Sequence, residues 1–314
     1  MKIHRRNRVL LALVVLCLGL DWLMRPQEAP AQERTPVFPQ LDPRRAVRVL
    51  LEGAEGEEVA AVELVRNGEE WKVASLYDFP AHAWIVEDLL ARLRGLSHND
   101  LVSNDPEAFK LFGFDGSERR LRIEDEHGKL LAQSTVARGP EERGSHVRPM
   151  GVDEVYRAPA LRYLDLNPER YVQADLVDFD PAQLEGLELE FAPEQALAHV
   201  ERMQDGRWRK SNGELLSPAK VDPLIAWSSH LYLLSVAAGE PDPQHGLSGG
   251  GWARLRLILQ DGECELIIGH AVPAEQGGLG ERYATNLTWE TPWVVTVSAL
   301  TAERLSRLAQ ALAH

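Results

Sequence analysis

The stretch that decides the fold is residues 64–96, LVRNGEEWKVASLYDFPAHAWIVEDLLARLRGL. Its first half holds two short β-like runs on either side of Asn67-Gly68, a pair that favours the positive φ angles of a tight hairpin turn. Its second half carries apolar residues at helical spacing, namely Val86, Leu89, Leu93 and Leu96. The stretch therefore predicts a β-hairpin followed by one amphipathic helix with a single buried face.

The same pattern returns in the second half of the chain. The recurring positions are Asp42-Pro43 with Asp180-Pro181, Trp71 with Trp208, Pro80-Ala81 with Pro218-Ala219, and Gly113 with Gly246. In this register the helix positions are matched by Leu224, Trp227, Leu231 and Leu234. We therefore expect an α+β fold of two tandem divergent repeats, 47–165 and 166–314, each a curved antiparallel sheet with a packed helix. The repeats are either separate or share a sheet across residues 158–180, and residues 301–313 form a final helix.

The N-terminus is typical of a membrane-directed segment. Residues 1–8 are basic and residues 9–24 are apolar except for Asp21. Residues 1–25 therefore predict either a cytoplasmic tail with a transmembrane anchor or a signal peptide. Either reading places the body on the periplasmic side of the bacterial inner membrane. Residues 26–46 contain five prolines among polar residues, which predicts an extended linker.

Composition excludes several classes of function. The 314 residues carry a net charge of −14, which disfavours binding to a nucleic-acid backbone. The only cysteines are Cys17 and Cys264, and Cys17 lies in the apolar N-terminal run, so neither a disulfide framework nor a cysteine-based zinc site is expected.

The motifs for catalysis lack the required context. Gly246-Leu247-Ser248-Gly249-Gly250 matches the G-x-S-x-G nucleophile elbow, which needs a strand before the serine and a helix after it. Prolines precede this motif and a strand-like run follows it, so we expect a glycine-rich turn and a dispensable Ser248. The histidines show no metal-ligand spacing, and the acidic pair Glu69-Glu70 is assigned no role. We expect no catalytic residue, no metal site and no cofactor.

The tryptophans supply the candidate contact residues. Trp71 and Trp208 end equivalent strands, which predicts that each lies in the core of its repeat. Trp289 and Trp293 flank Pro292 without a clear period. We therefore predict that Trp289 and Trp293 are exposed and contact a partner protein.

Residues 64–96, followed by LFGFDGSERRLRI (111–123) and SHVRPMGVDEVYRA (145–158), resemble a bacterial envelope family catalogued as domain of unknown function 4340. The resemblance covers about residues 45–300, once per repeat. Genes of that family often lie beside those of ABC-type transporters similar to gliding-motility machinery. The resemblance thus implies a non-enzymatic accessory subunit outside such a transporter, with transporter subunits as partners and residues 9–24 in the membrane. The alternative is a secreted hydrolase, or a glycan- or peptide-binding protein, that acts alone.

Overall fold

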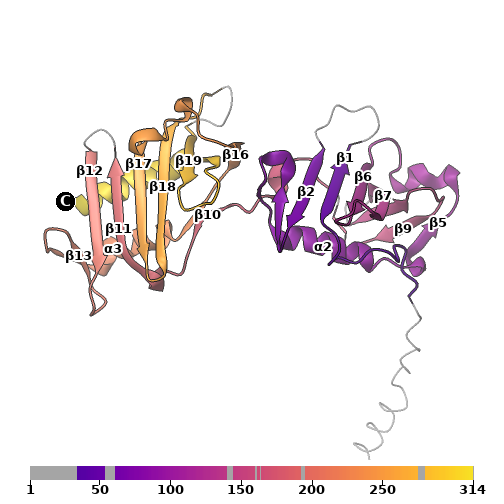
Figure 1. Ribbon diagram of the computed structural model, residues 1–314, viewed down its shortest axis with the longest axis horizontal. Coiled ribbons are helices and arrows are strands. Elements are labelled where there is room, and N and C mark those ends of the chain that lie inside the picture. Colours follow the sequence, from indigo (N-terminus) through magenta and orange to yellow (C-terminus); the bar gives the residue numbers. More distant parts are fainter. Residues whose placement is uncertain are drawn as a thin grey trace, which may run out of the picture.

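Two antiparallel sheets of nine strands each form most of the part of the protein that the structure describes (Figure 1). The computed structural model describes residues 34–53, 61–139, 144–159, 161–162, 164–191, 195–274 and 280–313. A third sheet of two strands, β10 (Asp175–Asp178) and β15 (His230–Tyr232), lies in the second half of the chain. The few helices pack beside the sheets, which confirms the α+β class.

The first sheet and its helix, α2 (Ala83–Arg94), are called the first unit. Across the sheet the strand order is β4-β3-β2-β1-β6-β7-β8-β9-β5. Its strands are β1 (Arg48–Glu52), β2 (Val62–Asn67), β3 (Glu70–Val73), β4 (Phe79–Pro80), β5 (Leu101–Ser103), β6 (Arg119–Glu124), β7 (Leu130–Arg138), β8 (Ser145–Pro149) and β9 (Val155–Ala158).

The second sheet, with α3 (Pro218–Ser228) and α4 (Ala299–Ala313), is called the second unit. Its strand order is β14-β13-β12-β11-β17-β18-β19-β20-β16. Its strands are β11 (Leu184–Phe191), β12 (Gln195–Arg202), β13 (Trp208–Lys210), β14 (Leu215–Leu216), β16 (Ser235–Ala238), β17 (Ala253–Leu259), β18 (Gly262–Ala271), β19 (Arg282–Asn286) and β20 (Val294–Val297).

The two nine-stranded sheets have the same connectivity. In each sheet, four strands run outward to one edge and a helix follows. The next strand of that sheet, β5 or β16, lies at the opposite edge, and four strands fill the space between; in the second unit β15 comes between the helix and β16 and pairs with β10 instead. The tryptophans occupy matching places, because Trp71 of β3 and Trp208 of β13 each stand opposite an arginine of the preceding strand, Arg66 and Arg202. Both indoles are buried, as predicted.

The predicted helix of the second half is too long. α3 ends at Ser228, where the hydroxyl groups of Ser228 and Ser229 donate to the carbonyls of Ile225 and Ala226. Such bonds between a serine and the preceding turn compete with continuation of a helix. Leu231 is buried within β15 instead, and Leu234 is exposed.

The alignment of the two halves that the sequence pattern predicts is therefore shifted at the helices. When the two helices are aligned at their first residues, their buried positions coincide. These positions are Val86, Leu89, Leu90 and Leu93 in α2, and Val221, Leu224, Ile225 and Ser228 in α3. Pro80 lies in β4, whereas Pro218 is the first residue of α3, so the Pro-Ala match is coincidental.

The predicted linker is wrong for its described part, since residues 35–46 pack against the first unit. The amide of Val37 donates to the carbonyl of Leu96, and the amide of His98 donates to the carbonyl of Thr35. Phe38, Leu41 and Ala46 are buried, because apolar residues stand between the prolines. The apolar run 9–24 lies outside the described residues, and none of the described helices is long and apolar enough to span a membrane.

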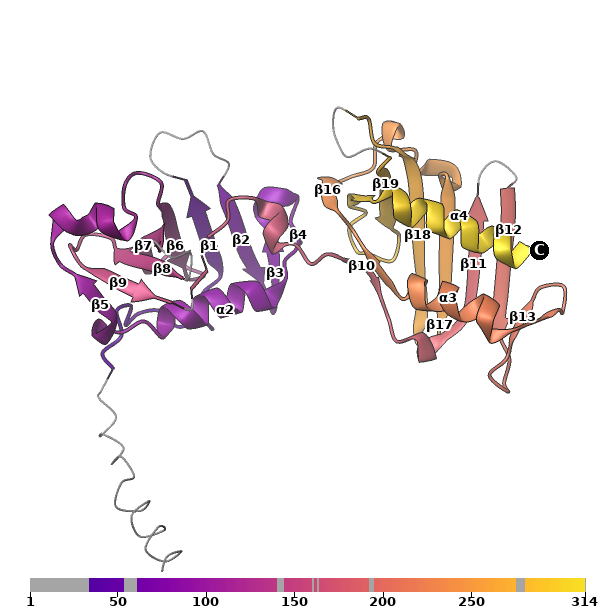
Figure 2. The same cartoon turned by 180° about the vertical axis from the view of Figure 1, so that it is seen from behind.

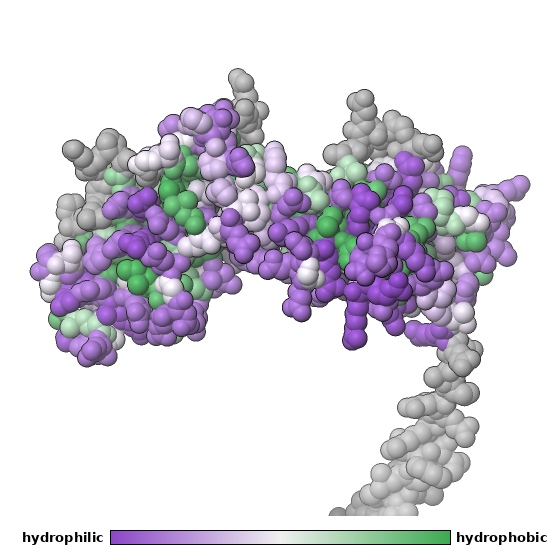
Figure 3. All heavy atoms as spheres, in the orientation of Figure 1, coloured by the Kyte–Doolittle hydropathy of each residue, from purple (hydrophilic) through white to green (hydrophobic). Residues whose placement is uncertain are grey.

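Each large sheet has one face against helices and one face toward solvent. The helices lie in front of the sheets in Figure 2 and behind them in Figure 1. Leu305 and Leu312 of α4 are buried against the second unit. The opposite face carries cross-strand ion pairs, such as Arg48 with Glu63 and Arg256 with Glu263. In Figure 3 hydrophilic residues cover most of that face.

Candidate functional site

The two units meet at the β4 edge of the first sheet, and the chain that joins the units lies along that edge. The amide of His82 donates to the carbonyl of Tyr171, the amide of Gln173 donates to the carbonyl of Pro80, and Ala81 pairs with Val172. This joining segment, residues 171–173, satisfies backbone groups that an edge strand leaves unpaired. We call this contact region between the units the junction.

Three aromatic rings form the centre of the junction. Phe79 of β4 lies 5.6 Å from Trp289 and 5.1 Å from Trp293, measured between ring centroids. The indole N–H of Trp293 donates to the carbonyl of Tyr77 over 2.8 Å. The two tryptophans come from the turn that enters β20, so they connect the second unit to the first.

These contacts correct the prediction that Trp289 and Trp293 are exposed. Trp293 is only 6% exposed, and Trp289 is partly buried against the common core. The prediction failed for a physical reason, because the rings pack on Phe79, which lies far away in the sequence. A role of the pair in binding a partner protein stays a prediction.

The backbone on the first-unit side of the junction is strained. Tyr77 and Asp78 have φ angles of 57° and 54°, a left-handed conformation that costs side-chain-bearing residues about 1 to 2 kcal/mol each. This turn leads into β4 and presents the Tyr77 carbonyl to Trp293. Tyr77 also lies so close to Gly239 that a Cβ atom there would come within 3.2 Å of the Tyr77 Cβ. The backbone turn at Tyr77 is thus in close contact with the second unit at both Trp293 and Gly239.

A half-buried carboxyl group completes the junction. One oxygen of Glu169 accepts the amide of Val236 in β16 over 3.1 Å, and the other oxygen has no hydrogen-bond partner. Burial raises the pKa of Glu169, and the bond from Val236 opposes that change.

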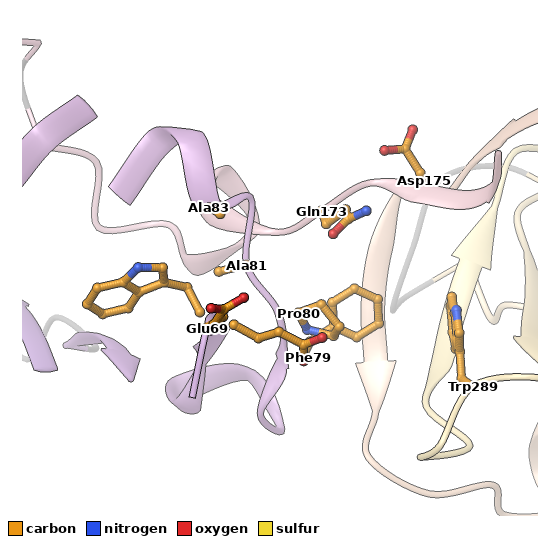
Figure 4. A pocket seen from close by; sticks show the side chains of 10 residues that line it. Glu69, Phe79, Pro80, Ala81, Ala83, Gln173, Asp175 and Trp289 are labelled. Atoms are coloured by element: carbon orange, nitrogen blue, oxygen red, sulfur yellow. The ribbon is translucent and has the colours of Figure 1, made fainter. Parts of the chain in front are cut away.

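A cleft of about 330 Å³ opens beside these rings (Figure 4). Figure 4 shows Phe79 and Pro80 facing Trp289 across it. The remaining lining residues are Glu69, Glu70, Trp71, Ala81, Ala83, Gln173 and Asp175. Trp71 is 1% exposed, and its indole N–H has no hydrogen-bond partner. The cleft therefore offers an apolar wall and three carboxylates, a combination suited to binding a group that is apolar and cationic.

The sequence alone gave no role to Glu69-Glu70. Glu69 lies in the hairpin turn and Glu70 is the first residue of β3. Asp175, the first residue of β10, reaches the same cleft. The placement of a carboxyl pair directly before the buried Trp71 was the available signal. Asp175 could not be found in this way, since it reaches the cleft only through the contact between units.

Ser248 does not occupy a nucleophile elbow. It is exposed in a short turn, Ser248–Gly250, which follows another short turn and precedes β17. Its neighbours match those of Asp115, because Gly113 and Gly246 both have positive φ angles and are followed by the buried Phe114 and Leu247. The glycine-rich turn is therefore confirmed in both units.

Other reactive side chains are arranged for structure. Cys264 is partly buried, and its sulfur accepts the side-chain amide of Asn286 over 3.4 Å. Burial raises the pKa of its thiol, which lowers the reactivity of the group. Within the described ranges, no three histidine, cysteine, aspartate or glutamate side chains are grouped so as to hold a metal ion.

Comparison with known proteins identifies a family but no characterised relative. The family model described as Domain of unknown function (DUF4340) matches residues 71–248 in one stretch, from Trp71 through part of the second unit. This match is narrower than the expected residues 45–300. No curated protein and no solved structure matches the chain. Since the model matches more than half of the chain, the protein belongs to the family of domain of unknown function 4340.

Proposed function

We propose that the protein is a non-enzymatic accessory or scaffold subunit of an envelope ABC-type transport assembly, and that it binds a partner subunit through the junction cleft. The observation that carries the proposal is the combination of aromatic rings and carboxylates in this cleft. Binding sites with aromatic centres and charged rims are typical of protein–protein contacts.

The cleft chemistry specifies the partner segment. Phe79 and Trp289 give an apolar wall, and Glu69, Glu70 and Asp175 give negative charge, so a lysine or arginine side chain fits both features. The ligand we propose is an extended, basic peptide segment of a transporter subunit.

The proposal includes the organisation of the whole chain. Residues 47–165 and 166–314 are two divergent copies of one unit, which the shared strand order supports. Residues 9–24 anchor the chain in the bacterial inner membrane, and the basic residues 1–8 support a periplasmic body.

The test is a detergent pull-down of the full-length chain, followed by mass spectrometry of the co-purified proteins. Wild type is compared with the triple variant Glu69→Gln, Glu70→Gln and Asp175→Asn. We expect the variant to recover about tenfold less of the transporter subunits, since several contacts near the centre of an interface are weakened.

Glu126→Gln is the matched control, because Glu126 is an exposed acid in the turn between β6 and β7. Circular dichroism checks that each variant is folded. If wild type retains no transporter subunit, the scaffold role is wrong. If the triple variant retains as much as wild type, the partner binds elsewhere.

A further inference from the structure

The second unit has a groove at the position that corresponds to the junction cleft of the first unit. In the first unit the junction cleft is lined by Trp71 of β3, Pro80 at the end of β4, and Ala83 at the start of α2. In the second unit a groove of about 620 Å³ is lined by residues at the same three places. They are Trp208 of β13, Leu216 at the end of β14, and Pro218 at the start of α3.

The junction cleft and the groove of the second unit differ in what covers them. The junction cleft is covered by the joining segment and by Trp289 of the second unit. At the groove, no backbone segment among the described residues bonds to the outer edge of β14. Leu215 on this edge is 48% exposed, and Ile225 of α3 contributes an apolar floor. An uncovered edge strand beside an apolar groove is a site for association.

The part of the second unit that packs into the junction also has an equivalent in the first unit. The second unit enters the junction with β16 and the turn before β20, and the same strand order makes β5 and the turn before β9 their equivalents. This end of the first unit exposes three apolar side chains. Leu101, Met150 and Val152 are 43%, 48% and 44% exposed.

The two unused surfaces lie at opposite ends of the long axis, with β5 at one end and β13 at the other (Figures 1 and 2). They therefore cannot meet within one chain. The charges add one candidate contact. Arg202 lines the groove, beside Asp222 and the ion pair of Arg207 with Asp205, and Asp153 is exposed in the turn before β9.

We propose that the chain binds a second copy of itself head to tail, with the β5–β9 end of one copy seated in the groove beside β14 of the next. The contact repeats the internal junction between copies, with the turn before β9, which carries Met150 and Val152, in the place of the turn that carries Trp289 and Trp293. A contact between two different surfaces leaves one of each free, so the assembly extends beyond a dimer. This inference goes beyond the proposed function and does not depend on a transporter partner.

Disulfide trapping tests the pairing of the two ends. Val152→Cys and Leu215→Cys are made in separate full-length chains, which are mixed and mildly oxidised. We expect a linked dimer that contains one chain of each kind, in several-fold excess over the mixture of Glu126→Cys with Leu215→Cys. The wild-type chain measures background from Cys17 and Cys264.

Sedimentation velocity supplies the second measurement. We expect the average mass of the wild-type chain to rise with concentration, and Leu215→Asp to abolish that rise while circular dichroism is unchanged. A chain that stays monomeric up to its solubility limit would contradict the proposal. So would equal trapping in the control mixture, or an oligomer that survives both Leu215→Asp and Val152→Asp.

Discussion

Among single residues, Glu169 makes the junction sensitive to pH. Its carboxyl group is half-buried between the units, and burial raises its pKa above the ordinary value of 4.5. A raised carboxyl pKa means that folding favours the protonated form. The resulting stability is fully present below the unfolded pKa and is lost as the pH rises through the folded pKa.

Glu169→Gln removes this dependence and keeps an oxygen that can accept the amide of Val236. We expect the variant to melt at a higher temperature than wild type at pH 8, and the difference to disappear near pH 4. Thermal unfolding across this pH range measures it. An equal or lower Tm for the variant at pH 8 would show that the ionised group stabilises the junction.

The residues also show what the sequence could reveal about the candidate site. Trp71 and Trp208 were assigned to the core correctly, because each ends a hairpin strand within its own unit. Trp289 and Trp293 looked unpartnered, since Phe79 belongs to the other unit. Periodicity reports contacts within an element or a hairpin, and it carries no information about contacts between units.

At the scale of elements, the same limit explains the error in α3. The apolar residues Leu231 and Leu234 continue the helical spacing, so the pattern alone extends the helix. The structure ends it because the hydroxyl groups of Ser228 and Ser229 bond back to the helix, and His230–Tyr232 pairs with β10. Tertiary pairing thus overrides the local pattern. The hairpin at Asn67-Gly68 was predicted correctly, since its turn is set locally, with Gly68 at a φ of 64°.

The glycine-rich turns before β6 and β17 allow a matched test of their structural role. At Gly246 a Cβ atom would lie 2.4 Å from the His270 ring, and at Gly113 it would lie 2.6 Å from the carbonyl oxygen of Arg138. Gly116 and Gly249 also have positive φ angles but have open space around them. Alanine should therefore cost about 1 kcal/mol at the open positions and roughly 3 kcal/mol at the crowded ones.

Urea unfolding of the four variants measures these costs. Ser248→Ala serves as the control in the same turn and should change the unfolding free energy by less than about 0.5 kcal/mol. Equal costs at all four glycines would mean that the close contacts with Arg138 and His270 relax. Covalent labelling of Ser248 by a fluorophosphonate would reopen the hydrolase alternative.

For the whole molecule, the junction determines whether the two units behave as one body. Each sheet has its own covering helices, so each unit could unfold separately if the contact between them were weak. The contact includes the rings of Phe79, Trp289 and Trp293, the bond from Trp293 to Tyr77, and the joining segment along β4. These features tie the stability of one unit to that of the other. We therefore expect the wild-type chain to unfold in a single calorimetric transition.

Trp293→Ala should split this transition in two. The substitution removes the ring contact with Phe79 and the hydrogen bond to Tyr77, and truncation of a buried tryptophan typically costs about 3 to 5 kcal/mol. Because Trp293 joins the units, its loss should uncouple them and leave the melting of the first unit nearly unchanged. Trp252→Ala is the control, since Trp252 packs on Phe191 and Arg282 within the second unit and should lower the transition without dividing it. A single transition in Trp293→Ala, shifted as far as that of the control, would mean that the joining segment alone couples the units.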